Sequence, residues 1–196
     1  MSDLDLKTIR NALARLGAVL DEENIQCRIC LYGGSAMMFI SDLSNLSKDI
    51  DYRVVPFDGM ATEHLRSLES IVRRAAFAVG ESLNLDVDWM NDAVKIFASE
   101  YEDYSSEMTF GNGALQVLTP SPKCLLAMKC LCLRDDETSK DANAVKILLK
   151  VLNIRDLETV NQIVKQYFPR KDIPLEQMAK IDGILKELSD ADWPPQ

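Results

Sequence analysis

The sequence predicts an α+β fold, in which a small mixed β-sheet flanked by helices is followed by a C-terminal helical bundle. Two observations lead to this prediction. In residues 1–118, short apolar or alternating runs, typical of strands, stand between longer segments with the helical period. After Pro120-Ser121-Pro122, every long segment has the helical period. We therefore expect one domain over 1–118 and a helical domain over 119–196.

The first elements follow from the spacing of apolar residues. Leu4–Leu20 places leucine, isoleucine and valine side chains on one face of a helix, which the polar residues 21–24 end. The apolar run Ile25–Tyr32 is expected to form a strand. Gly33–Ile40 is expected to form a turn and a short helix, because a Gly-Gly pair opens an apolar segment.

The remainder of the first domain alternates strands and helices. We expect a strand over Asp49–Val55, closed by Pro56, and a helix with one apolar side over Thr62–Val79. In Leu83–Trp89, apolar and acidic residues alternate, which predicts another strand. The last expected elements are a helix over Asn91–Tyr101, a loop over Tyr104–Gly113 and a strand over Leu115–Leu118.

Four helices are expected in the second domain, each with apolar residues at the helical period. Pro169 and Pro174 interrupt the chain between the third and the fourth. The expected helices are Lys123–Arg134, Lys140–Leu152, Leu157–Phe168 and Leu175–Leu188.

Composition excludes several classes of function. The 196 residues are 47% apolar, enough for an ordinary core, and no apolar run approaches the roughly 20 residues that span a bilayer. The N-terminus lacks the basic and apolar regions of a secretory signal, so we expect a cytoplasmic protein with no membrane partner. The net charge of −9 argues against broad nucleic-acid binding, which requires clustered Lys and Arg.

The five cysteines and the one histidine do not indicate a reactive site. Cys27 and Cys30 are three residues apart in an expected strand and point to opposite faces, so they are not expected to ligate one metal ion. Burial in the core is the better prediction for all five cysteines. His64 lies among charged residues of an expected exposed helix, which argues against histidine-based nucleophilic catalysis.

Gly33-Gly34-Ser35 and Asp49-Ile50-Asp51 form the first candidate site. Backbone N–H groups of a Gly-Gly-Ser turn at the start of a helix can hold a phosphate group. Asp49 and Asp51 project from the same face of a strand, and such a pair can hold Mg²⁺. The alternative is a simple tight turn with Ser35 as a helix cap, beside a solvated sheet edge.

The expected strand over Leu83–Trp89 adds two carboxylates. Asp86 and Asp88 share one face of that strand, as Asp49 and Asp51 do. Four carboxylates on one face of a small sheet repel one another unless a cation is present. Either Asp86 or Asp88 is therefore a candidate for a third metal ligand.

These segments resemble a known family. The turn at 33–35, followed after thirteen residues by the Asp-x-Asp at 49–51, is similar to the Gly-Ser and Asp-x-Asp signature of the DNA-polymerase-β-like nucleotidyltransferase superfamily. Residues 88–95 (Asp-Trp-Met-Asn-Asp-Ala-Val-Lys) and the helix that begins Leu-Leu-Ala-Met-Lys at 125–129 resemble the bacterial DUF6036 group, whose relatives include AbiEii-type nucleotidyltransferase toxins. The resemblance covers roughly residues 25 to 155 and implies the nucleotidyltransferase fold.

The resemblance implies roles for individual residues. Asp49, Asp51 and Asp88 would bind the metal ion, Mg²⁺ or Mn²⁺, with Asp86 as the alternative to Asp88. Contacts to the nucleotide phosphates would come from Gly33, Gly34 and Ser35, and the triphosphate would be assisted by Lys129 and Asp141. From the residues alone, Lys129 is equally a lysine whose stem lies along a half-buried helix and needs a partner or a cleft.

The implied activity is Mg²⁺-dependent transfer of an NMP group from an NTP to an unidentified acceptor, which is a small molecule, a protein or tRNA, with release of pyrophosphate. Asp88 would activate the acceptor as a base or join the metal ligands. The sequence departs from the group at Ala144, where a second aspartate is usual, and at Lys140, where arginine is frequent. Ala144 and the acidic surface favour an alternative: a catalytically silent protein of the same fold that binds a protein partner in a toxin–antitoxin or defence system.

Overall fold

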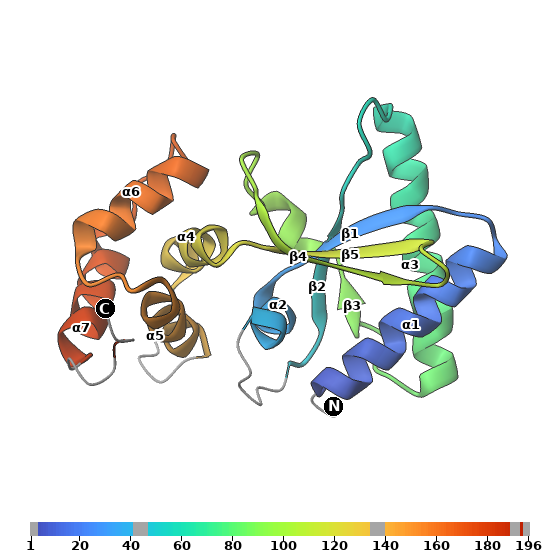
Figure 1. Cartoon of the computed structure of the whole chain (residues 1–196), viewed down its shortest axis with the longest axis horizontal. Coiled ribbons are helices and arrows are strands. Elements are labelled where there is room, and N and C mark those ends of the chain that lie inside the picture. The colour runs from blue at the N-terminus through green and yellow to red at the C-terminus, as the bar shows by residue number, and fades with distance from the viewer. Residues whose placement is uncertain (1–3, 41–46, 134–139, 189–192, 194–196) are drawn as a thin grey trace. The chain divides into compact units, whose positions relative to one another are not determined.

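The computed structural model describes residues 4–40, 47–133, 140–188 and 193, and the chain divides into two compact units (Figure 1). Unit 1 runs to Ile96 and resumes over Tyr104–Thr119. Unit 2 combines Phe97–Asp103 with the chain from Pro120 onward. The division at 119–120 lies next to the boundary expected from the sequence, whereas the sequence places 97–103 in the first domain.

Unit 1 has the α+β architecture with a mixed sheet that the sequence predicts. Within the described residues, five strands lie in the order β3-β2-β1-β5-β4. β2 runs antiparallel to β1 and parallel to β3, while β1 is parallel to β5. The strands are β1 (Cys27–Leu31), β2 (Ile50–Val54), β3 (Met90–Asn91), β4 (Tyr104–Phe110) and β5 (Leu115–Pro120).

The helices of unit 1 are α1 (Leu6–Glu22), α2 (Gly33–Ile40) and α3 (Thr62–Leu83), with a short 3-10 helix, η1 (Ala93–Ile96). α1 packs beside α3 (Figure 1) and buries its apolar face, as the spacing of leucines and isoleucines predicts. Gly17 lets α1 approach the end of β4, because a Cβ at this position would lie 2.7 Å from the Cβ atom of Phe110. Arg28 of β1 donates to the side chain of Gln116 on β5 and lies over the ring of Phe57.

Three helices end in the same way, with an asparagine in the left-handed region. Asn24, Asn84 and Asn153 have φ of 56°, 54° and 52° and follow α1, α3 and α5 (Lys140–Leu152). At α3, the N–H of Asn84 donates to the Glu81 carbonyl, and the N–H of Leu85 donates to the Gly80 carbonyl. This is a Schellman motif, which satisfies the last helical carbonyls and turns the chain sharply.

The prediction of a strand over Leu83–Trp89 is wrong. α3 continues to Leu83, and residues 84–89 form a turn that leads into the two-residue strand β3. The alternation of apolar and acidic residues is present, but Val87 is 66% exposed and has no core to enter. A local pattern thus predicts a strand that neither a neighbouring strand nor burial supports.

Two further elements of unit 1 differ from the prediction. The expected helix over Asn91–Tyr101 is limited to η1, because Asn91 ends β3 and residues 97–103 join unit 2. The expected loop over Tyr104–Gly113 contains β4, an edge strand of mostly polar residues that lacks the apolar face of an interior strand. The Ser105 hydroxyl lies 3.1 Å from that of Thr119 on β5.

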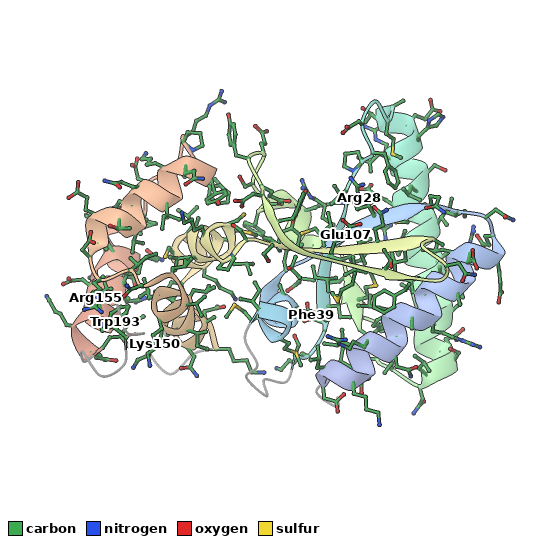
Figure 2. All side chains as sticks on the ribbon, viewed as in Figure 1. Arg28, Phe39, Glu107, Lys150, Arg155 and Trp193 are labelled. Atoms are coloured by element: carbon green, nitrogen blue, oxygen red, sulfur yellow. The ribbon has the colours of Figure 1, made fainter. Side chains whose placement is uncertain are left out.

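Unit 2 contains the four predicted helices within its described residues. They are α4 (Pro122–Cys132), α5, α6 (Leu157–Tyr167) and α7 (Leu175–Glu187), and α4 packs against the other three. The guanidinium of Arg155 lies 5.2 Å from the ring centroid of Trp193 (Figure 2). Throughout the described residues, no helix has both the length and the apolar character that crossing a membrane requires.

A hydrogen-bond network attaches residues 97–103 to the helices of unit 2. The Asp103 carboxylate accepts from the hydroxyls of Ser121 (2.6 Å) and Tyr167 (2.8 Å). Ser121 also caps α4, and the Ser99 hydroxyl donates to the Tyr167 carbonyl at 2.6 Å. Burial raises the pKa of Tyr167 to about 12, so its phenol donates to Asp103 at neutral pH.

Candidate functional site

The connection between β1 and α2 brings the start of a helix against β2. The N–H of Tyr32 donates to the carbonyl of Asp51 at 2.9 Å, which joins the end of β1 to β2. Gly33 follows with φ of +61°, and a Cβ at this position would overlap the Oδ2 atom of Asp51. Glycine is needed here both for its backbone conformation and for the close approach of the carboxylate. The N-terminus of α2 and the Asp51 side chain are therefore neighbours.

The first turn of α2 presents backbone donors at this place. The helical hydrogen bonds begin with the N–H of Ala36, which donates to the Tyr32 carbonyl at 3.1 Å. The N–H groups of Gly33, Gly34 and Ser35 precede this bond, and N–H groups at such positions have no partner within the helix. Together with the helix dipole, they form a site suited to an anion such as phosphate.

The Ser35 side chain bonds to the backbone of the same turn. It is fully buried, and its hydroxyl donates to the Tyr32 carbonyl at 2.9 Å. This hydrogen bond fixes the turn between β1 and α2. A phosphate contact by Ser35 therefore falls to its backbone N–H.

Ser47 braces the same turn from the other side. Its hydroxyl donates to the carbonyl of Asp49 at 2.8 Å, and its backbone bridges to Leu4. A Cβ at Gly34 would lie 2.7 Å from the Ser47 hydroxyl oxygen. Gly34 thus leaves space for Ser47, whose hydroxyl fixes the backbone at Asp49.

Asp49 and Asp51 lie where the sequence predicts them, at the start of β2. Along this strand, Ile50, Tyr52 and Val54 are buried, while Asp51 and Arg53 are partly exposed, so the expected alternation is confirmed. Asp49 is also partly exposed.

Asn91 is the side chain of β3 that contacts this pair. In the parallel register Asp51 lies opposite Asn91, and the amide nitrogen of Asn91 donates to Oδ2 of Asp49 at 2.9 Å.

Trp89 holds β3 in position. Its indole is 1% exposed, and its N–H donates to the Ala76 carbonyl of α3 at 2.9 Å. Gly80 of α3 leaves space for the ring, because a Cβ there would lie 2.8 Å from two indole atoms. The Trp89 carbonyl in turn accepts from the N–H of Ile50 at 2.7 Å, which starts the pairing of β3 with β2.

Asp92 anchors the chain after Asn91. Its carboxylate accepts from Arg73 of α3 at 2.8 Å and from Lys95 at 2.9 Å. Burial acts to raise the pKa of Asp92, but the hydrogen bonds and charges of Lys95 and Arg73 outweigh it and keep the pKa below its usual value. Asn91 thus lies between Trp89 and Asp92, which are both bonded to α3.

Asp86 and Asp88 do not share a strand, so the geometric reason for placing either beside Asp49 and Asp51 is wrong. Both side chains are exposed in the turn after α3, and the N–H of Asp88 faces the Asp86 carboxylate at 3.4 Å. Among the described residues, no three Asp, Glu, His or Cys side chains gather as a metal-binding group.

Within unit 2, Lys129 and Asp141, to which the resemblance gives a role at the triphosphate, form an ion pair. The Lys129 ammonium of α4 lies 2.5 Å from a carboxylate oxygen of Asp141 at the start of α5, and the two side chains are 18% and 22% exposed. The predicted need of Lys129 for a partner is therefore met.

Four of the five cysteines lie in the core as predicted, whereas the prediction of burial is wrong for Cys132, at the exposed end of α4. Cys27, Cys30, Cys124 and Cys130 are buried, and Cys132 is exposed. Burial raises the pKa of the Cys27 and Cys130 thiols to about 12, which opposes the thiolate form that metal binding requires.

Sequence reasoning missed Asn91 and Ser47. The signal for Asn91 was its position two residues after Trp89, a large apolar residue that directly precedes β3, but the predicted strand ended at Trp89. Ser47 gave no signal, because its role depends on the approach of Gly34 from another element.

Comparison of the sequence with models of protein families and with curated proteins found no match.

Proposed function

We propose that this chain is an Mg²⁺-dependent nucleotidyltransferase, with the fold of the DNA-polymerase-β-like superfamily, that moves an NMP group from an NTP to an acceptor. The observation that carries the proposal is the contact between Gly33 and the Asp51 carboxylate. It puts the N–H groups of a helix N-terminus, which suit phosphate, beside a carboxylate, which suits a divalent cation.

The donor set fits Mg²⁺. Proteins bind Mg²⁺ through one or two carboxylates, while substrate phosphates and water complete its coordination. Asp49 and Asp51 would hold the ion. The backbone of Asp49 is fixed by the Ser47 hydroxyl and that of Asp51 by the N–H of Tyr32, which limits the movement of both carboxylates. When bound, the ion would neutralise charge on the triphosphate.

The proposed reaction is an in-line displacement at the α-phosphorus. A bond forms from the acceptor oxygen or nitrogen to the α-phosphorus, the bond from that phosphorus to the bridging oxygen breaks, and pyrophosphate leaves with the electron pair. The proton of the acceptor is released to water. Positioning and charge stabilisation supply most of the catalysis in such transfers, so the chain needs to fix the phosphates and the carboxylates.

Lys129 and Asp141 enter the proposal through the resemblance alone. A lysine that binds phosphate acts as a point charge on a flexible stem. The Asp141 carboxylate contacts the Lys129 ammonium and compensates its charge on a half-buried helix.

The experiment that tests the proposal is transfer of label from each of the four α-³²P-NTPs, with Mg²⁺ or Mn²⁺. The acceptors are small hydroxyl compounds, the protein itself and bulk tRNA. We expect labelled product with at least one pair and loss of that product in Asp51→Asn. Asp58→Asn is the matched control, because Asp58 is exposed in the turn after the same strand.

Transfer that survives in Asp49→Asn/Asp51→Asn would overturn the proposal. Titration with a non-hydrolysable NTP separates the catalytically silent alternative. Binding that needs Mg²⁺ and is lost in Asp49→Asn supports a nucleotide site, whereas the absence of any Mg²⁺-dependent NTP binding favours a partner-binding module.

A further inference from the structure

Asn91 makes two hydrogen bonds through its side-chain amide. The nitrogen donates to Oδ2 of Asp49 at 2.9 Å, and the oxygen accepts from the backbone N–H of Ala93 at 3.2 Å. A backbone N–H only donates, so the amide oxygen must face Ala93. The amide nitrogen is therefore directed at Asp49. A flipped amide would place its oxygen against the Asp49 carboxylate and its nitrogen against the N–H of Ala93, and neither contact is a hydrogen bond.

The backbone that carries Asn91 is held on both sides. Trp89 is anchored in α3 and paired with Ile50, and Asp92 is bonded to Arg73 of α3. Side chains that orient a metal ligand work only when their own positions are fixed. Asn91 meets this condition.

We propose that Asn91 is a positioning residue, which holds the Asp49 carboxylate in the orientation that binds the divalent cation. This inference rests on the proposed function and deepens it. The bond to Oδ2 restricts rotation of the carboxylate and leaves Oδ1 to face a ligand. Because the amide is neutral, it orients Asp49 without the repulsion that a third carboxylate at hydrogen-bond distance would cause.

The test is binding of Mn²⁺ alone, measured by calorimetry or by the spin resonance of free Mn²⁺, on the full chain. We expect Asn91→Ala to weaken binding about tenfold or more, as loss of a hydrogen-bond partner of a metal ligand typically does. The thermal midpoint should stay close to that of the unchanged protein. Transfer activity of Asn91→Ala should recover as the Mg²⁺ concentration is raised, which a purely structural defect would not allow.

Asn112→Gly is the matched control. The Asn112 amide donates to Asp21 at 2.7 Å on an exposed surface of the same unit, and glycine accepts the φ of 51° at this position. This variant loses the same kind of amide–carboxylate bond and should keep Mn²⁺ affinity.

Equal Mn²⁺ affinity in Asn91→Ala and the unchanged protein would overturn the inference while leaving the proposed function intact. No Mn²⁺ binding by the unchanged protein would instead count against the proposed function. If Asn91→Ala does not fold, side-chain amide resonances of the ¹⁵N-labelled unchanged protein decide. The Asn91 pair should move on addition of Mg²⁺ more than the Asn112 pair, and an unmoved Asn91 pair would overturn the inference.

Discussion

Asp49-Ile50-Asp51 and Asp86-Val87-Asp88 of unit 1 have the same local sequence pattern but form two different structures. Asp49-Ile50-Asp51 opens β2, between β1 and β3, and Ile50 is fully buried. Asp86-Val87-Asp88 forms part of an exposed turn, and Val87 is 66% exposed. Alternation of apolar and acidic residues therefore forms a strand only where the apolar residue has a core to enter and the backbone has a neighbouring strand.

The helix that precedes the second segment decides its conformation. The Schellman motif at Asn84 and Leu85 directs the chain away from α3, and Trp89 then binds back into the same helix at Ala76 and Gly80. The three residues between Leu85 and Trp89 bridge these two fixed points as a turn. The strand that pairs with β2 on the side away from β1 is β3, which Met90 and Asn91 form after this turn.

The largest expected difference between the two segments concerns transfer activity. Under the proposed function, Asp51→Asn removes a metal ligand and should lower transfer by about three orders of magnitude, since a metal ion contributes several kcal/mol of charge stabilisation. Asp88→Asn should change transfer by less than about threefold, because its carboxylate lies in the exposed turn. The measurement is initial rate at saturating Mg²⁺. An equal loss in Asp88→Asn would show that Asp88 acts as a third carboxylate.

The next largest effect is expected from the space that α3 leaves for Trp89. Gly80→Val places its side chain where the indole lies and should lower the free energy of unfolding by about 1–3 kcal/mol, the usual range for overpacking a core. Chemical denaturation followed by Trp fluorescence measures this. Gly183→Val is the control, because a Cβ at Gly183 of α7 meets no atom within 4 Å. An equally stable Gly80→Val protein would show that Trp89 is not held at this site.

A smaller effect is expected at the end of α3. Asn84→Ala puts a residue with a Cβ and no local hydrogen bond into the left-handed region, which should cost about 1 kcal/mol of unfolding free energy. Asn84→Gly should be neutral or slightly stabilising, because glycine takes this conformation freely. Thermal unfolding of both variants gives the comparison. If alanine and glycine were equivalent, the turn at 84–89 would owe nothing to the Schellman motif.

The smallest expected effect is the pH dependence of the contact beside Asn91. The pKa of Asp92 is lowered in the folded state, so its contribution to stability is present above the usual aspartate pKa near 4 and is lost as the pH falls below it. Asp92→Asn should lower the free energy of unfolding by about 0.5–1 kcal/mol at pH 7, the range for a partly exposed ion pair. At pH 3 this difference should shrink. A difference that stays constant from pH 7 to pH 3 would contradict the role of the ion pair.

Most helices and the centre of the sheet are predictable from the sequence, since their periodicity agrees with their burial. α2 and α5 have the predicted bounds, and the ends of β1 and β2 differ from the predicted ends by at most two residues. The polar strand β4 is not predictable, because it lacks an apolar face and depends on β5 for its pairing.

In the candidate site, the carboxylates of β2 and the glycines of α2 are predictable from local patterns. The contact between Gly33 and Asp51 is not, because it joins elements that are 18 residues apart in the sequence. Asn91 is missed for the same reason. Its partner Asp49 is 42 residues away, and the pairing requires that Trp89 be seated on a third element first.

Residues 97–103 are attached through Ser99 and Asp103 to Ser121 and Tyr167, which has a consequence for how the chain folds as it is synthesised. Tyr167 follows Asp103 by 64 residues, so a growing chain exposes the short segment well before its helical partners leave the ribosome. Unit 2 needs residues 97–103 in addition to the continuous stretch of chain that begins at Pro120. A fragment that starts at Pro120 would lack Ser99 and Asp103 and would leave the Tyr167 phenol without its carboxylate. The two units are therefore expected to fold as interleaved parts of one chain and not as separable modules.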